Sequence, residues 1–168
     1  MAKRLLREWK GVAWLITLVM TALSAAAQTV VLSDGIYFFK TDDNKLLTRG
    51  EPYGSAVQLY DWGLPIRIST DASGITTLKF ADAADWLIFD DGTGIYADNA
   101  NPENKTWKIT KSGDKYVFQN TISNRYMKVD GSRVLSTATQ SEAYAFTIVT
   151  PSESVFVSTS SAGSHTGF

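Results

Sequence analysis

The sequence predicts an all-β domain built from one unit written three times. Each unit opens at a glycine, 39 residues after the one before: Gly35, Gly74 and Gly113. A second apolar run in each unit ends at a spacing of 40 residues: Leu47, Leu87 and Met127. Self-similarity at a fixed period is the signature of a repeated supersecondary unit. After Gln28 no apolar stripe with helical spacing is long enough to form a helix, which favours strands throughout.

The first copy, residues 35–73, predicts four short strands, at 36–39, 45–48, 56–60 and 65–70. The first two are rich in strand-forming residues and flank the polar turn 41–44, which is typical of a hairpin. The connection 49–55 is longer and holds two glycines and Pro52. A short β-branched run at 29–32 precedes the copy and predicts a lead-in strand.

The second and third copies, residues 74–112 and 113–150, repeat this order. Strands are expected at 75–80, 86–89, 94–97, 106–110, 115–119, 125–129, 132–136 and 145–149. Turn dipeptides separate them, of which Asp130-Gly131 is the strongest hairpin signal. The repeats therefore predict one domain over residues 28–150. The Ser/Thr/Gly-rich segment 151–168 breaks the period and is interpreted as a tail or a linker.

The first 27 residues have the order of a secretory signal peptide. A basic start is followed by the uncharged apolar run 11–23 and by the small residues 24–27. An apolar run of this length is short for a bilayer span, which needs about 20 residues. We expect a helical signal peptide cleaved between Ala27 and Gln28, with an uncleaved anchor or a buried helix as the alternatives. The protein is then secreted or displayed at the cell surface.

Composition excludes several classes of function. The chain has 44% apolar residues and no cysteine, so a packed core is expected but no disulfide scaffold, thiol nucleophile or thiolate metal site. The full chain carries a net charge of −1 and the leader contributes +3, which leaves −4 on the remainder. An acidic chain without a basic run predicts no nucleic-acid partner and, after cleavage, no membrane partner. A monomer without a cofactor is expected.

The copies resemble a known family. The Gly-x-x-Tyr-x-Phe start, the polar turn and the Arg-Tyr-Met return of 113–127 are similar to the repeating unit of fascin-like and ricin-like β-trefoils. The resemblance implies pseudo-threefold symmetry, with six strands closing a barrel and six forming three hairpins that cap one end. The ricin-type sugar residues are not kept, because Thr48, Ile88 and Lys128 stand where that family places aspartate. A leader ending in Ala-Ala-Ala-Gln before such a module is similar to secreted proteins of Gram-negative gut-type bacteria, where it often begins a longer surface protein.

Catalysis is not predicted. The single histidine, His165, lies in the tail, where no packing can hold it as a general base or metal ligand. Five aspartates gather in the second copy: Asp82, Asp85, Asp90, Asp91 and Asp98. They lack the spacing of a calcium-binding loop, and aspartate is common in β-turns because its side chain caps backbone N–H groups. A glycosidase pair needs only two carboxylates, but a small barrel filled by side chains leaves no deep cleft.

Aromatic residues in turns are the best candidates for a binding site. A sugar ring packs its apolar face on an aromatic ring while nearby polar groups bind its hydroxyls. The first copy offers Tyr53, Tyr60, Asp61 and Trp62, and the third offers Arg125, Tyr126 and Asp130. The alternative interpretation of Trp62 is that it plugs one end of the barrel. Because the turn residues differ between copies, three equal sites are not expected.

Three functions follow from these observations. The first is a secreted or cell-surface, non-catalytic module that binds a glycan or a protein and forms the N-terminal part of a larger protein. The second is a protease inhibitor that presents the loop 49–55 to an enzyme. The third is an accessory domain of a secreted hydrolase.

Overall fold

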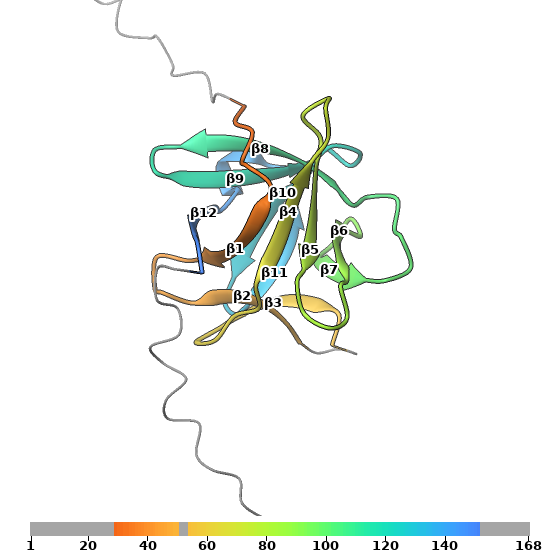
Figure 1. Ribbon diagram of the computed structural model, residues 1–168. Coiled ribbons are helices and arrows are strands. Elements are labelled where there is room, and N and C mark those ends of the chain that lie inside the picture. Colours follow the sequence, from red (N-terminus) through yellow and green to blue (C-terminus); the bar gives the residue numbers. More distant parts are fainter. Residues whose placement is uncertain (1–28, 51–53, 152–168) are drawn as a thin grey trace, which may run out of the picture.

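The computed structural model describes residues 29–50 and 54–151, which form an all-β domain (Figure 1). The strands are β1 (Gly35–Lys40), β2 (Leu46–Gly50), β3 (Ala56–Tyr60), β4 (Ile66–Thr70), β5 (Thr76–Phe80), β6 (Leu87–Asp90), β7 (Ile95–Asp98), β8 (Thr106–Ser112), β9 (Lys115–Asn120), β10 (Tyr126–Asp130), β11 (Arg133–Thr137) and β12 (Ala145–Val149). A single helical turn, η1 (Gln140–Glu142), interrupts them within the described ranges. The expected signal peptide and the tail beyond Pro151 lie outside these ranges.

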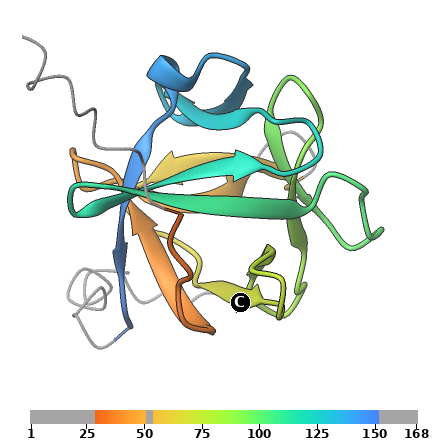
Figure 2. The same ribbon diagram turned by 90° about the horizontal axis from the view of Figure 1, so that it is seen from above.

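The strands form one antiparallel sheet that closes on itself. β1 pairs with both β4 and β12, and the ring continues through β5, β8 and β9, with β9 pairing β12. The hairpins β2–β3, β6–β7 and β10–β11 join this ring through β1, β5 and β9. They also pair with one another, β3 with β7 and β11 with β3. Figure 2 shows the strands running round a closed outline.

The β-trefoil prediction is corrected to a closed antiparallel β-barrel. The predicted trefoil sets a barrel of six strands apart from a cap of six, with three equivalent copies. Hydrogen bonds instead join all twelve strands into one sheet. Corresponding strand pairs also differ in length: six residue pairs join β8 to β9, five join β4 to β5 and three join β12 to β1. The repeat in the sequence reflects where strands and turns recur, and the resemblance to fascin-like and ricin-like modules is not supported.

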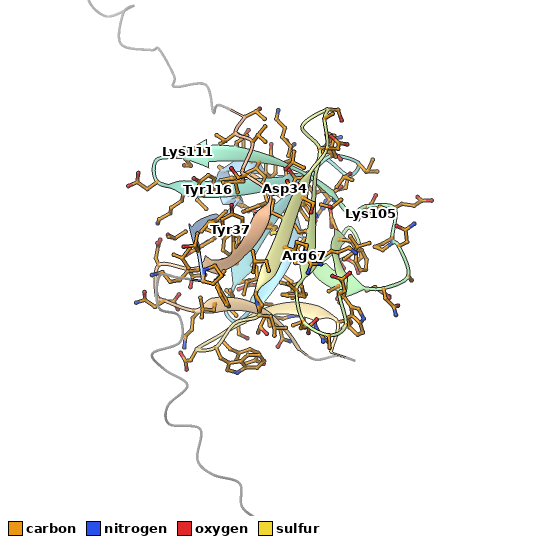
Figure 3. All side chains as sticks on the ribbon, in the orientation of Figure 1. Asp34, Tyr37, Arg67, Lys105, Lys111 and Tyr116 are labelled. Atoms are coloured by element: carbon orange, nitrogen blue, oxygen red, sulfur yellow. The ribbon has the colours of Figure 1, made fainter. Side chains whose placement is uncertain are left out.

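The core fills the closed sheet with large apolar side chains. Phe39, Phe118 and Phe146 are buried and their rings lie in mutual contact, with centroids 4.8 to 6.2 Å apart. Trp107 is also buried and donates its indole N–H to the carbonyl oxygen of Ile88 at 3.1 Å. Removing each such side chain from water stabilises the fold by about 1.5–3 kcal/mol. Strand β4 shows the alternation that this burial requires, with buried isoleucines beside the outward-pointing Arg67 (Figure 3).

The second copy has a different register from the predicted one. Its turn is longer: the N–H of Phe80 bonds the carbonyl of Trp86, whereas the N–H of Thr41 bonds the carbonyl of Lys45. Lys45 and Trp86 thus close the two turns. The core residue lies two positions after each of them, at Leu47 and Ile88, and both side chains are buried. Leu87, which the 40-residue spacing assigns to the core, is only half-buried.

A residue with positive φ ends the same turn in each copy: Asn44 (64°), Asp85 (49°) and Asn124 (58°). Asparagine and aspartate tolerate this left-handed conformation better than other residues with a side chain. The following residue then closes the turn and starts the return strand. The polar turns predicted from sequence therefore have a backbone conformation that their composition explains.

A buried polar network joins the second and third copies. The side chain of Asn120 accepts the N–H groups of Ile122 and Ser123, both at 3.0 Å, and donates to the carbonyl of Asn104 at 2.8 Å. The hydroxyl of Ser123 in turn donates to Asp90, which is itself buried. These bonds satisfy the backbone of the β9–β10 turn without water.

Turn carboxylates predict a loss of stability in acid. The hydroxyl of Ser73 and nearby backbone N–H groups lower the pKa of Asp71, and the hydroxyl of Thr137 lowers the pKa of Glu142. Their contribution is complete above the ordinary values of 3.8 and 4.5 and is lost as pH falls through the lowered folded values. We expect the melting temperature to fall progressively below about pH 4. Asp71→Asn should make the melting temperature depend less on pH in this range. A wild-type melting temperature that does not change with acid would contradict the prediction.

Candidate functional site

Two exposed aromatic rings form a stacked pair at the end of β3. The rings of Tyr60 and Trp62 have centroids 5.8 Å apart and planes inclined by 5°. Tyr60 is 41% exposed and Trp62 is 55% exposed. Other tyrosines of the surface, such as Tyr37 and Tyr116 (Figure 3), are half-buried. The exposure of Trp62 argues against a plug in the barrel, and we call the stacked pair the aromatic platform.

The platform is held by its own strand and by β2. The hydroxyl of Tyr60 donates to Oε1 of Gln58 at 2.8 Å. After Trp62 the chain passes directly against β2, since a Cβ atom at Gly63 would lie 2.5 Å from Cβ of Leu46. The backbone N–H of Leu64 then bonds to β2 at 3.1 Å. The turn that carries Trp62 is therefore fixed at both ends.

An ion pair borders the platform. Lys45 Nζ lies 2.6 Å from a carboxylate oxygen of Asp61, and this hydrogen bond raises the pKa of Lys45. The Asp61 side chain is 89% exposed, so the pair contributes little to stability. The carboxylate therefore stays accessible to solvent beside the turn that carries Trp62. Of the predicted residues of the first copy, Tyr60, Asp61 and Trp62 thus lie together, while Tyr53 lies outside the described residues.

The three residues predicted in the third copy do not form one site. Arg125 donates to the side chain and the carbonyl of Ser136, at 2.7 and 3.0 Å, and so ties β10 to β11. Tyr126 starts β10 and is half-buried, whereas Asp130 ends the same strand. Tyr126 and Asp130 are four residue steps apart along the strand, a distance of about 13 Å. Arg125 and Tyr126 are therefore placed for a structural role, away from Asp130.

Asp130 and its turn lie beside the first copy instead. Arg133 of β11 is the register partner of Gln58, and the N–H of Leu59 bonds the carbonyl of Ser132 at 2.8 Å. The β10–β11 turn therefore runs next to the platform. Sequence reasoning missed Arg133, because only the pairing of strands from different copies brings it there.

The aspartates of the second copy cap turns, as their alternative interpretation predicts. Asp82 accepts the N–H of Ala84 at 3.2 Å, and Asp98 accepts that of Ala100 at 2.9 Å. Asp90 and Asp91 accept N–H groups in the same way, and Asp85 forms ion pairs with Arg67 and Lys79. No group of three or more histidine, cysteine, aspartate or glutamate residues is arranged for a metal ion within 29–50 and 54–151.

The loop expected for a protease inhibitor is held at one end. Arg49 donates to the carbonyl of Gly54 at 3.1 Å and pairs with Asp82 at 2.7 Å. Its guanidinium also lies 4.4 Å from the ring centre of Trp86. Residues 51–53 lie outside the described residues. The side chain of Arg49 therefore packs against the β5–β6 turn. The described part of the loop leaves no charged side chain free to contact an enzyme.

Comparisons with known proteins find likeness in structure and none in sequence. No protein-family model and no curated protein matches the chain. SeviL, bound to asialo-GM1 saccharide, has a TM-score of 0.58 at 9% identity over 71% of this chain and 99% of its own. A Culex salivary protein of the Cysteine and Tryptophan-Rich family has a TM-score of 0.57 at 14% identity, over 76% of this chain and 98% of its own. The Haemophilus ducreyi cytolethal distending toxin has a TM-score of 0.57 at 11% identity, over 76% and 92%.

At these identities the likeness shows the fold alone. The matched proteins differ in kind, so none of them assigns an activity to this chain. A search of the described segments for a helix long and apolar enough to cross a membrane finds none.

Proposed function

We propose that the protein is an exported, non-catalytic module that binds a saccharide on the aromatic platform. The observation that carries the proposal is the parallel stack of Tyr60 and Trp62, two exposed rings beside an exposed carboxylate. One ring supports the other, so the outer face of the pair presents a flat apolar surface of fixed orientation. A sugar ring packs its C–H face on such a surface, while Asp61 accepts hydrogen bonds from its hydroxyls.

Two further observations support the proposal. The fold is shared with a protein bound to a saccharide, a salivary protein and a toxin, which is consistent with a binding module in general terms. The leader supports export, because its basic, apolar and small-residue segments follow the order of a signal peptide. Export predicts a mature protein that begins at Gln28, and mass spectrometry that finds the leader still attached would contradict this part of the proposal.

Replacing Trp62 with alanine should weaken saccharide binding strongly while leaving the fold intact. The platform loses its more exposed ring, and truncation of a central aromatic anchor typically costs about 2 kcal/mol, or roughly thirtyfold in affinity. A glycan array identifies ligands of the wild-type protein, and titration calorimetry then measures their affinity for the variant.

The matched control is Ile122→Ala, which truncates another exposed apolar side chain, 60% exposed, in the β9–β10 turn. It should bind like the wild-type protein. An unchanged saccharide affinity of Trp62→Ala would overturn the platform as the site. An array on which the wild-type protein binds nothing would overturn the proposed function itself.

A further inference from the structure

Arg133 lies next to the aromatic platform although it belongs to another copy. It starts β11 and is exposed, and its register partner on β3 is Gln58. Directly paired residues of antiparallel strands point to the same face of a sheet. Gln58 accepts the hydroxyl of Tyr60, so the side chains of Arg133, Gln58 and Tyr60 lie on the same face of the sheet, where Arg133 and Tyr60 are exposed and Gln58 is buried. The bond from Leu59 N–H to the carbonyl of Ser132 fixes this register.

The distance suits a ligand that touches both strands. Arg133 and Tyr60 are diagonal neighbours across the β3–β11 pair, and such neighbours lie about 7–8 Å apart, within reach of long side chains. A monosaccharide on the platform would therefore place its substituents close to the guanidinium.

Within residues 29–50 and 54–151, the charge of Arg133 has no partner. The other three arginines of the described residues are each engaged: Arg49 with Asp82, Arg67 with Asp85 and Arg125 with Ser136. Lys45, the other cation beside the platform, is paired with Asp61. Arg133 has no hydrogen bond or ion pair in the described part of the chain, and its cross-strand partner Asp130 forms no salt bridge with it.

We propose that the platform takes an acidic saccharide, whose ring packs on Trp62 and whose carboxylate binds the guanidinium of Arg133. This inference rests on the proposed function and names its ligand class. A guanidinium presents paired N–H donors that match the two oxygens of a carboxylate, which a neutral hydroxyl cannot do. Asp61 then binds hydroxyls of the same ring, at the other side of the platform.

The test compares saccharides that differ only in a carboxylate. The array carries matched pairs of chains, one member ending in glucuronic acid and the other in glucose, and affinities are measured at low and high salt. We expect the wild-type protein to bind the acidic member of a pair about tenfold or more tightly, since hydrogen bonds to charged groups contribute more than neutral ones. Added salt should reduce this preference.

Arg133→Gln should lower the affinity for the acidic member to that for the neutral member. Lys108→Gln removes an equal charge from the exposed side of β8 and should keep the preference. Equal binding of both members by the wild-type protein, or a preference that survives Arg133→Gln, overturns the inference. If that inference fails but neutral saccharides bind and require Trp62, the proposed function still stands. Binding of neither member refutes the proposed function as well.

Discussion

Replacing Ile88 with glutamate should unfold the protein. Ile88 is fully buried, and its carbonyl accepts the indole N–H of Trp107 in the middle of the core. The substitution loses the burial of an apolar side chain and places a carboxylate where no cation is available. The expected loss exceeds about 5 kcal/mol, which is comparable to the whole stability of a typical domain. Loss of the β-sheet signal in circular dichroism, with rapid proteolysis, would report it.

The neighbouring residue provides the control. Leu87→Glu changes the chain at the next position, where the side chain is half-buried and the register partners are Lys79 and Asp98. A carboxylate there stays in contact with water and with a lysine, so the variant should fold and lose about 1–2 kcal/mol. The 40-residue spacing of the sequence predicts the reverse order of effects. A folded Ile88→Glu variant would show that the register of β6 is wrong.

Asn120→Leu should destabilise the folded state by about 3 kcal/mol. The fully buried amide accepts two backbone N–H groups, which leucine leaves without this partner, and donates to the carbonyl of Asn104, which keeps only its bond from the N–H of Asp90. Each unsatisfied buried group costs about 1–3 kcal/mol, and the added apolar contact offsets only part of that. Urea denaturation followed by tryptophan fluorescence measures the free energy of unfolding.

Gln119→Leu is the matched control for this substitution. Gln119 is adjacent and half-buried, and its side chain makes one exposed hydrogen bond, to the carbonyl of Asn124 at 3.1 Å. Water can replace that bond, so the variant should lose less than about 1 kcal/mol. Equal losses for the two variants would mean that the amide network of Asn120 contributes nothing specific.

The sequence predicted the strands better than their arrangement. Alternation and turn residues located all twelve strands to within a few positions, because both are local properties of the chain. The trefoil prediction went wrong because the pairing of strands depends on contacts between distant segments, which a repeat does not specify. The misplaced Leu87 has a similar cause: a turn of different length shifts the register while the overall period stays near 40.

The platform was predictable for the same reason. Tyr60, Asp61 and Trp62 are consecutive, so a single exposed turn brings them together. Tyr126 and Asp130 are also close in sequence, but the extended strand β10 holds them about 13 Å apart. Arg133 lies beside the platform only because β11 pairs with β3, and no local sequence pattern predicts that pairing.

The pairing of β1 with β12 sets an order on folding. The last strand, β12, pairs with both β1 and β9. A chain that is still being synthesised therefore has two open sheet edges, on β1 and β9, until residues 145–149 have left the ribosome. Open edges are sites where chains aggregate or are bound by chaperones. Contacts between such distant segments also slow folding. The barrel of such a chain can close only when synthesis is nearly finished, because β12 is the partner of both edges.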